Sequence, residues 1–457
     1  MLSPGTEPSS ATRHDSENVT AGRVNTLLLL VAVLLPCIAA FAILYRQSLS
    51  FPYQDDYVVI LEFATDYDQA PTWQSKLMHV ATDQVNEYKL GFEHAVVVTD
   101  LELAHHLDFG ILTGIGNAFL LAIAYLLWRT YQEGEKNLHQ RLLLFLPISL
   151  IFFSLTYWEN LNWATTDLQN IPVIFFSFLA IYLLFPGKTL VPTHMRMLLA
   201  CLSAALAAFT SANGFLLGPV GLLILLPRRA WVKALVWCAS FVVPLAAYLY
   251  HFSVPVHPVN STFYFTRPLF FLAFLGCGAI PLRWPAALAG IVILAILWLA
   301  VRTRFDRINP VAFYFAIWIL ATAMLVAWVR GASSFLIGSR YSIYSILLLV
   351  FCYSFLMHYL SGRSSPLNRR RFYLACLVVA AAMCFAADVH AYRKLGERRR
   401  MVFAGIELYR ADPEANSPLI DPPILKAYPG EDSVEQRALT KAIHERVYKL
   451  PRKPDLR

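Results

Sequence analysis

The sequence predicts an all-α polytopic membrane protein. Of its 457 residues, 57% are hydrophobic and only 15% are charged. A soluble domain of that length cannot bury so much apolar surface, whereas a bundle of transmembrane helices exposes it to lipid. Two further observations predict the same fold class. Apolar runs long enough to cross a bilayer recur along the chain, and basic residues gather in alternate connections between them.

The apolar runs predict a bundle of about 11 transmembrane helices over 25–389, since one span needs roughly 20 residues. The polar stretch 1–24 before it is predicted to be a disordered cytoplasmic tail. The first run exceeds the roughly 7–15 residues of a signal-peptide core, so we interpret it as an uncleaved span. The runs are 25–45, 109–128, 142–157, 171–185, 197–212, 215–227, 235–250, 285–301, 310–329, 341–361 and 373–389.

Basic residues set the orientation of this bundle. With the N-terminus inside, the inner connections hold most of the Arg and Lys residues, as the positive-inside rule requires. The large first loop, 46–108, and the C-terminal tail, 390–457, are then both predicted to face the periplasm. The tail begins with a basic stretch, "YRKLGERRR", which long terminal segments tolerate because they obey the rule poorly. The short outer loops carry only Arg267, Arg283, Arg330 and Arg340.

One apolar segment, "PLFFLAFLGCGAIPL" at 268–282, is too short to fit this scheme. If it crossed the membrane, every later loop would change side and "NRRRF" would lie outside. We therefore interpret the segment as re-entrant or surface-lying.

An acidic pair follows the first span. "FPYQDDYVVI" (51–60) places Asp55 and Asp56 between Tyr53 and Tyr57. One interpretation is a solvated turn within an aromatic belt at the interface. The other is a general base or a cation site, because a carboxylate beside apolar surface loses hydration and its pKa rises. In an extended chain, Asp55 would share a face with both tyrosines.

Further polar candidates lie in the predicted outer regions. In "WENLNWATTDLQN" (158–170), Glu159 and Asp167 are expected at the surface or facing a water-filled cavity, since charge inside a bilayer is costly. "GSRYS" places Arg340 at the start of a span, where it either snorkels or binds an anion. A metal cluster in "NEYKLGFEH" and "LAHHLDF" is conceivable, although adjacent histidines point in different directions on a helix.

Several of these stretches together resemble the GT-C superfamily of membrane glycosyltransferases. The acidic pair directly after the first span carries the resemblance, with Asn86-Glu87-x-Lys89 before the second span. "ENLNWATTDLQN", "SANGFLLGPVGLLILL" and "GSRYSIYSILLL" are similar to stretches at matching places in bacterial relatives. The chain has Tyr88-Lys89 where His-Arg is common in the superfamily, which leaves the role of that element open.

The resemblance implies a polyprenyl-phosphate-linked sugar as donor, used on the periplasmic face of the bacterial inner membrane. A first-loop carboxylate would act as base, with a divalent cation possible. It implies a catalytic group of Asp55, Asp56 and Glu87, and a donor-phosphate group of Arg340 and Lys89. Weaker substrate-binding candidates are Tyr53, Tyr57, Glu159, Asn162, Asp167 and Tyr341.

We therefore predict a glycosyltransferase that moves one monosaccharide to a periplasmic acceptor, either an envelope glycan such as O-antigen or a protein such as pilin. One alternative is a membrane transporter or lipid-glycan flippase. Against it, no Asp, Glu or Lys falls in the middle of a predicted span. A polymerase or ligase of lipid-linked glycans is the other alternative. The net charge of +8 is assigned to inner loops and tail, so no nucleic-acid partner is expected.

Overall fold

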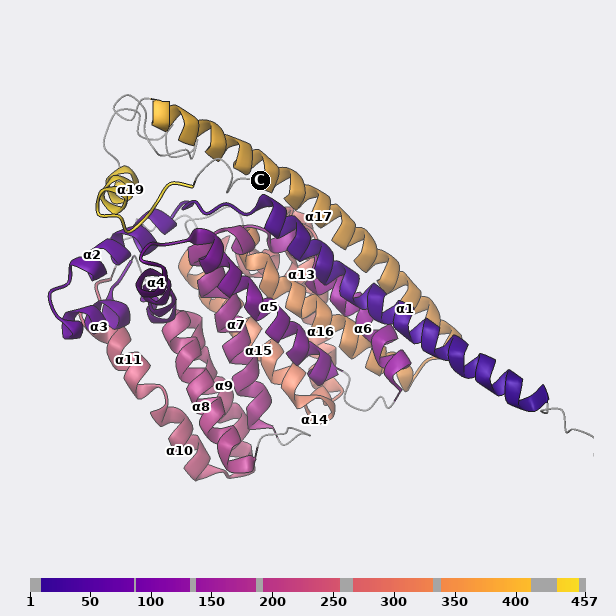
Figure 1. The fold of residues 1–457 in the computed structure, drawn as a ribbon. Helices are drawn as coiled ribbons and strands as arrows, with labels where there is room; N and C mark the ends of the chain where they lie inside the picture. Colours follow the sequence, from indigo (N-terminus) through magenta and orange to yellow (C-terminus); the bar gives the residue numbers. More distant parts are fainter. Residues whose placement is uncertain are drawn as a thin grey trace, which may run out of the picture.

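A computed structural model describes residues 10–85, 88–131, 137–185, 192–254, 266–331, 338–411 and 434–451. Within these residues the chain is helical and contains no strand, only two isolated β-bridges. The long helices lie side by side as one bundle (Figure 1). In chain order the elements are α1 (Ser10–Gln47), η1 (Tyr57–Glu62), α2 (Phe63–Gln69), α3 (Trp73–Thr82), α4 (Gly91–Ala104), α5 (Phe109–Tyr131), α6 (Leu138–Phe152), η2 (Leu155–Tyr157), η3 (Asn160–Asn162), α7 (Ala164–Leu184), α8 (Thr193–Thr210), η4 (Ala212–Leu216), α9 (Leu217–Leu225), η5 (Leu226–Arg228), α10 (Trp231–Ala239), α11 (Val242–Leu249), α12 (Thr266–Gly276), α13 (Arg283–Arg302), α14 (Phe305–Ile308), α15 (Pro310–Arg330), η7 (Ser339–Tyr341), α16 (Ser342–Ser361), α17 (Pro366–Ala411) and α19 (Val434–His444).

In the described part of the chain, nine helices are long and apolar enough to cross a membrane, as a multi-pass membrane protein requires. Each coincides with one of the predicted apolar runs. The two remaining runs, 197–212 and 215–227, fall on the shorter apolar helices Met195–Thr210 and Ala212–Arg228. The nine are Val24–Gln47, Phe109–Tyr131, Leu138–Tyr157, Ala164–Leu184, Trp231–Leu249, Arg283–Arg302, Pro310–Arg330, Ser339–Ser361 and Pro366–Glu407.

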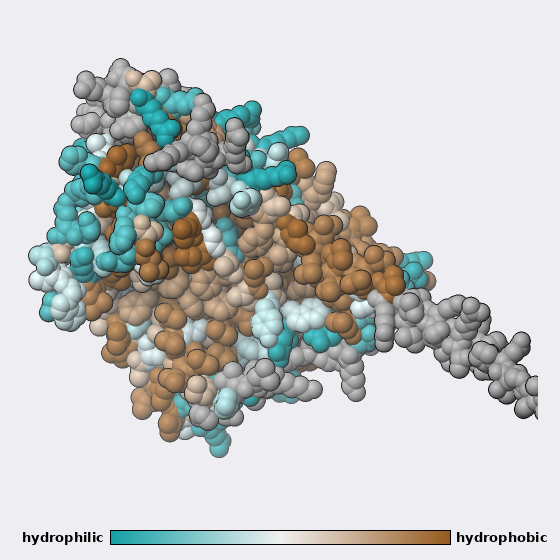
Figure 2. Space-filling model, in the orientation of Figure 1, coloured by the Kyte–Doolittle hydropathy of each residue, from teal (hydrophilic) through white to brown (hydrophobic). Residues whose placement is uncertain are grey.

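The bundle surface is apolar, as contact with lipid requires. Figure 2 shows hydrophobic side chains over the bundle and hydrophilic ones gathered over the first-loop region. Large apolar side chains remain exposed on several helices, such as Leu28 on α1, Leu235 on α10 and Phe385 on α17. In water such a surface would be a severe liability, whereas in a bilayer it is the expected outer face.

The first loop and the C-terminal segment form one polar cap at the same end of the bundle (Figure 1). Lys441 of α19 pairs with Asp66 of α2 at 3.0 Å. Tyr448 forms a β-bridge with Leu107, and its hydroxyl donates to the carbonyl of Ser50. The two segments that the sequence assigns to the outer side therefore lie in direct contact.

Helix α17 is much longer than the predicted span 373–389. Its 46 residues correspond to about 69 Å, more than twice the thickness of a hydrocarbon core. The boundary predicted at residue 390 falls inside this helix, because nothing in "YRKLGERRR" breaks it. Beyond the bundle α17 continues past the end of α1, where Arg399 donates to the carbonyl of Arg46.

Helix α12 does not traverse the bundle. At its start the Thr266 hydroxyl donates to the carbonyl of Gly331 at the end of α15. Just after its end, the Gly278 N–H donates to the Ser345 hydroxyl at the start of α16. A helix of 11 residues measures only about 16 Å, and both its ends adjoin the connection between α15 and α16. The helix is shorter than a membrane span, and the surface-lying or re-entrant position of 268–282 stays a prediction.

The contact between α19 and the first loop predicts which exposed positions share a side of the membrane. We expect cysteines at Gln74→Cys and His444→Cys to react with a membrane-impermeant maleimide from the outer side of intact cells, in a background without the native cysteines. Asn368→Cys, in the first turn of α17 at the opposite end, should react only after the cells are opened. Labelling of Asn368→Cys and protection of His444→Cys in intact cells would invert the proposed orientation.

Candidate functional site

A cavity of about 500 Å³ lies where the first loop meets the bundle. Its walls come from the first loop, the starts of α7 and α16, the η4 turn, α11 and the C-terminal half of α15. The volume is within the range of small-molecule sites, about 300–1,000 Å³. Of the described residues, three charged side chains line it: Asp55, Arg330 and Arg340.

The two acids of the pair have opposite surroundings. Asp56 is 1% exposed, and its carboxylate accepts the N–H groups of Tyr53 at 3.0 Å and Thr165 at 2.9 Å. Thr165 is the second residue of α7, so Asp56 caps that helix at its positive end. Burial raises the pKa of Asp56 to about 6, against the opposing effect of these bonds and of Arg398. Asp55 instead is exposed and lines the cavity.

A tight turn separates these carboxylates. Gln54 has a positive φ of 45°, and the Asp56 N–H donates to the carbonyl of Tyr53. The chain then enters η1 at Tyr57, which is 1% exposed. The extended conformation in which Asp55 would share a face with both tyrosines is therefore wrong. The turn, rather than strand alternation, brings Asp55 to the cavity.

Two arginines face the same cavity from the connection between α15 and α16. The Arg340 guanidinium carbon lies 5.4 Å from the ring centroid of Trp163 and 5.2 Å from that of Tyr341. Arg330, at the end of α15, donates to the Tyr88 hydroxyl at 3.0 Å. The sequence analysis assigned no role to Arg330, although it lies at a span end that is predicted to be outer, just as Arg340 does. Tyr341, a weaker candidate from the sequence, also lines the cavity.

Arg398 of α17 supports the acidic turn from behind. Its guanidinium carbon lies 3.8 Å from the ring centroid of Tyr53, and its Nη1 donates to the carbonyl of Asn162 at 2.5 Å. The side chain is 8% exposed, and its charge lowers the pKa of Asp56. Sequence reasoning missed Arg398 because it assigned the basic stretch to a solvated tail. The only signal was a basic run that the charge distribution did not explain.

Lys89 does not line the cavity, which contradicts its predicted place beside a donor phosphate. Its ammonium donates to the carbonyls of Ala247 and Tyr250 at the C-terminus of α11, where a cation is favourable. The side chain is 5% exposed, and this burial lowers its pKa against the opposing charge of Asp83. Glu87 lies outside the described residues.

Asp167 is fully buried, so its expected position at a surface or a water-filled cavity is wrong. It packs against Gly116 of α5, where an added Cβ would lie 2.4 Å from the Asp167 Cγ. The glycine therefore creates the space that the carboxyl group occupies. Asn162 is also buried and serves the site through its backbone carbonyl, while Glu159 is half-buried and does not line the cavity.

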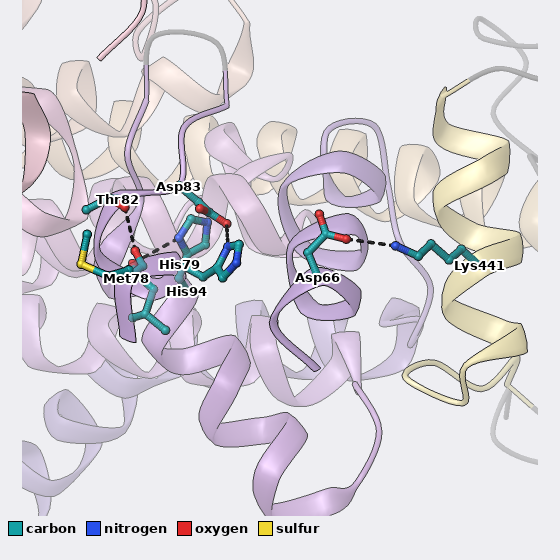
Figure 3. A network of polar contacts seen from close by, with 8 residues as sticks. Asp66, Met78, His79, Thr82, Asp83, His94 and Lys441 are labelled. Carbon is teal, nitrogen blue, oxygen red and sulfur yellow. Dashed lines mark hydrogen bonds and ion pairs between the residues drawn. The ribbon is translucent and has the colours of Figure 1, made fainter. Parts of the chain in front are cut away.

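The histidine-rich part of the first loop forms a separate polar network (Figure 3). His79 pairs with Asp83 at 2.9 Å, and the ring of His94 stacks on Phe63 with centroids 3.9 Å apart. Burial lowers the pKa of His94 to about 4, so this ring stays neutral. Among the residues that the structure describes, no group of three or more His, Cys, Asp or Glu side chains is placed to hold a metal.

Glu93, one residue before this ring, is fully buried near the acidic pair. Burial raises its pKa well above the ordinary value, and the charges of Asp56 and Asp55 raise it further. The hydroxyl of Thr165 acts in the opposite direction. Thr165 thus lies between the cavity, which it lines, and this second buried carboxyl group.

Comparisons with known proteins identify no relative: no family model, no curated protein and no solved structure matches the chain. The candidate site therefore rests on its own geometry.

The different surroundings of the two acids predict different losses of stability on truncation. Asp56→Ala leaves the buried N–H of Thr165 without its acceptor, at a cost of about 1–3 kcal/mol. Asp55→Ala, the matched control, removes an exposed carboxylate and should change the free energy of unfolding by about 0.5 kcal/mol or less. Thermal unfolding in detergent would measure both. Equal unfolding temperatures for the two variants would contradict the capping role of Asp56.

Proposed function

We propose that the chain is a GT-C-like glycosyltransferase that moves a monosaccharide from a polyprenyl phosphate to a periplasmic acceptor. One observation carries this proposal: Asp55, Arg330 and Arg340 line one cavity where the first loop meets the bundle. A potential base and two potential phosphate ligands thus share one space. Arginine is well suited to phosphate because its planar fork can donate two parallel hydrogen bonds.

The membrane arrangement supports a lipid-linked donor. In the proposed topology eleven helices cross a bacterial inner membrane, and the large first loop faces the periplasm. The cavity has an apolar wall on α15, made of Leu325, Val326 and Val329. Val329 is 43% exposed and Trp328 beside it is 67% exposed, so this wall borders the lipid-facing surface. A polyprenyl chain can leave the cavity on that side while its phosphate stays near the arginines.

In the proposed reaction, the acceptor hydroxyl attacks the anomeric carbon of the donor sugar. Asp55 takes the hydroxyl proton as the new carbon–oxygen bond forms. The bond from the anomeric carbon to the phosphate oxygen breaks, and polyprenyl phosphate leaves with the electron pair. Arg330 and Arg340 stabilise the charge that develops on that phosphate. Asp56 and Arg398 keep the turn of Asp55 in place without touching substrate.

Two rival functions make different products. A transporter or flippase of lipid-linked glycans is favoured by the buried carboxyl groups of Glu93 and Asp167, which proton-coupled carriers often contain. It would leave its substrate chemically unchanged. A glycan polymerase or ligase would transfer a block of sugars instead of one. Mass analysis of the acceptor, made in membranes with and without the protein, separates all three.

The assignment of the base predicts that Asp55→Asn lowers sugar transfer by at least ~10²-fold, because the amide keeps the size of the side chain but cannot take the proton. Asp56→Asn should reduce transfer less, in proportion to its loss of folded protein. Transfer to the acceptor in cells is measured at matched protein levels. Full activity of Asp55→Asn would refute the base assignment.

If both arginines bind the donor phosphate, Arg330→Lys and Arg340→Lys should each bind polyprenyl phosphate more weakly. Each lysine keeps the charge but loses the planar fork, and we expect a loss of about 1.5–3 kcal/mol for each bond to a charged group. Binding of polyprenyl phosphate to the purified protein measures this directly. Lys89→Gln is the matched control and should bind polyprenyl phosphate as the unmodified protein does. A greater loss of polyprenyl-phosphate binding in Lys89→Gln than in either arginine variant would contradict the arginine assignment and indicate Lys89 as the phosphate ligand.

A further inference from the structure

The inner wall of the cavity is a network of uncharged polar side chains. Asn170, Asn213 and Tyr344 come from α7, η4 and α16, and all are more than nine-tenths buried. Asn213 Nδ2 donates to the Tyr344 hydroxyl at 3.1 Å, and this hydroxyl lies 3.5 Å from Asn170 Oδ1. Asn170 Nδ2 in turn donates to the carbonyl of Thr166. These contacts hold the amides in fixed orientations.

Two polar atoms of this wall have no hydrogen-bond partner among the described residues. They are Asn213 Oδ1 and the hydroxyl oxygen of Thr322 on α15. Both side chains line the cavity, and they are 6% and 1% exposed. A buried polar atom without a partner is unfavourable, so both atoms are suited to hydrogen bonds from a bound molecule. Together they offer an amide acceptor and a hydroxyl that can either donate or accept.

The wall lies deeper in the bundle than the arginines. Thr322 precedes Arg330 by eight residues on α15, which corresponds to about 12 Å along the helix. Tyr344 follows Arg340 by four residues, about 6 Å along its helix. When the arginines hold the donor phosphate, the sugar attached to it therefore faces this inner wall.

We propose that Asn170, Asn213, Thr322 and Tyr344 form a glycosyl site that binds the donor sugar and selects an uncharged one. This inference rests on the proposed function and names its substrate class. Hydroxyl groups of a neutral sugar match the amides and hydroxyls of the wall. A uronate or an aminosugar with a free ammonium group would bury a charge with no opposite charge among these four residues, which is strongly unfavourable.

Direct binding tests the glycosyl site without requiring transfer. Purified full-length protein is titrated with four short-chain ligands: bare polyprenyl phosphate, and the same phosphate carrying a neutral hexose, a uronic acid or an aminosugar. Native mass spectrometry gives the dissociation constants. We expect the neutral hexose form to bind at least ~10-fold more tightly than either charged form, from one unpaired buried group at ~1.4 kcal/mol per factor of ten.

Substitutions in the glycosyl site test whether its residues cause the preference for a neutral sugar. Thr322→Val and Asn213→Leu remove these two polar atoms at similar side-chain size. Both should weaken binding of the neutral form by about 10-fold or more while leaving bare polyprenyl phosphate unaffected. Ser177→Ala is the matched control, because Ser177 also has a buried hydroxyl oxygen without a partner among the described residues but does not line the cavity. It should bind all four ligands as the unmodified protein does. Thermal unfolding confirms that each variant is folded.

The outcomes separate the two proposals. Equal or tighter binding of a charged sugar, with bare polyprenyl phosphate also bound, overturns the glycosyl site and leaves the proposed function standing. Unchanged binding of the neutral form by both Thr322→Val and Asn213→Leu also overturns the site, since the sugar then makes no hydrogen bond to these atoms. Failure of all four ligands to bind overturns the proposed function and the glycosyl site with it.

Discussion

The candidate site depends on one buried carboxylate, that of Asp56. It joins the first loop to the bundle by accepting the N–H of Tyr53 on one side and that of Thr165 on the other. A buried charge is costly unless it is hydrogen-bonded and compensated. Here the start of α7 and the nearby guanidinium of Arg398 provide that compensation. This junction helps to hold the neighbouring Asp55 in its position relative to the cavity.

Much of the fold follows from sequence because it depends on local composition. Runs of about 20 apolar residues become membrane-length helices almost wherever they occur, since the backbone must satisfy its own hydrogen bonds in lipid. The short run 268–282 has fewer residues than a membrane span needs, and α12 has only 11 residues. The sequence predicts both Asp55 and Arg340 at outer ends of spans. The two residues line the same cavity in the structure.

The remaining features depend on contacts between distant residues. The motif around Lys89 suggested that it binds the donor phosphate. In the structure its ammonium instead donates to the carbonyls at the end of α11. Asp167 was expected to need water, yet a glycine on α5 makes room for it inside the protein. Arg398 follows Asp56 by more than 300 residues, and no local pattern links them. Residue type and spacing alone cannot predict such pairs.

The continuity of α17 connects this site to the physical state of the bilayer. Figure 1 shows α17 running beside α1 and on past its end. A helix of fixed apolar length changes its tilt when membrane thickness changes. Arg398 lies 13 residues beyond the lipid-facing Phe385, about 20 Å along a rigid rod, so a rotation of ~10° displaces it by about 3 Å. A displacement of that size would separate Arg398 from Tyr53, which lie 3.8 Å apart, so α17 provides a mechanical link between bilayer thickness and the acidic turn.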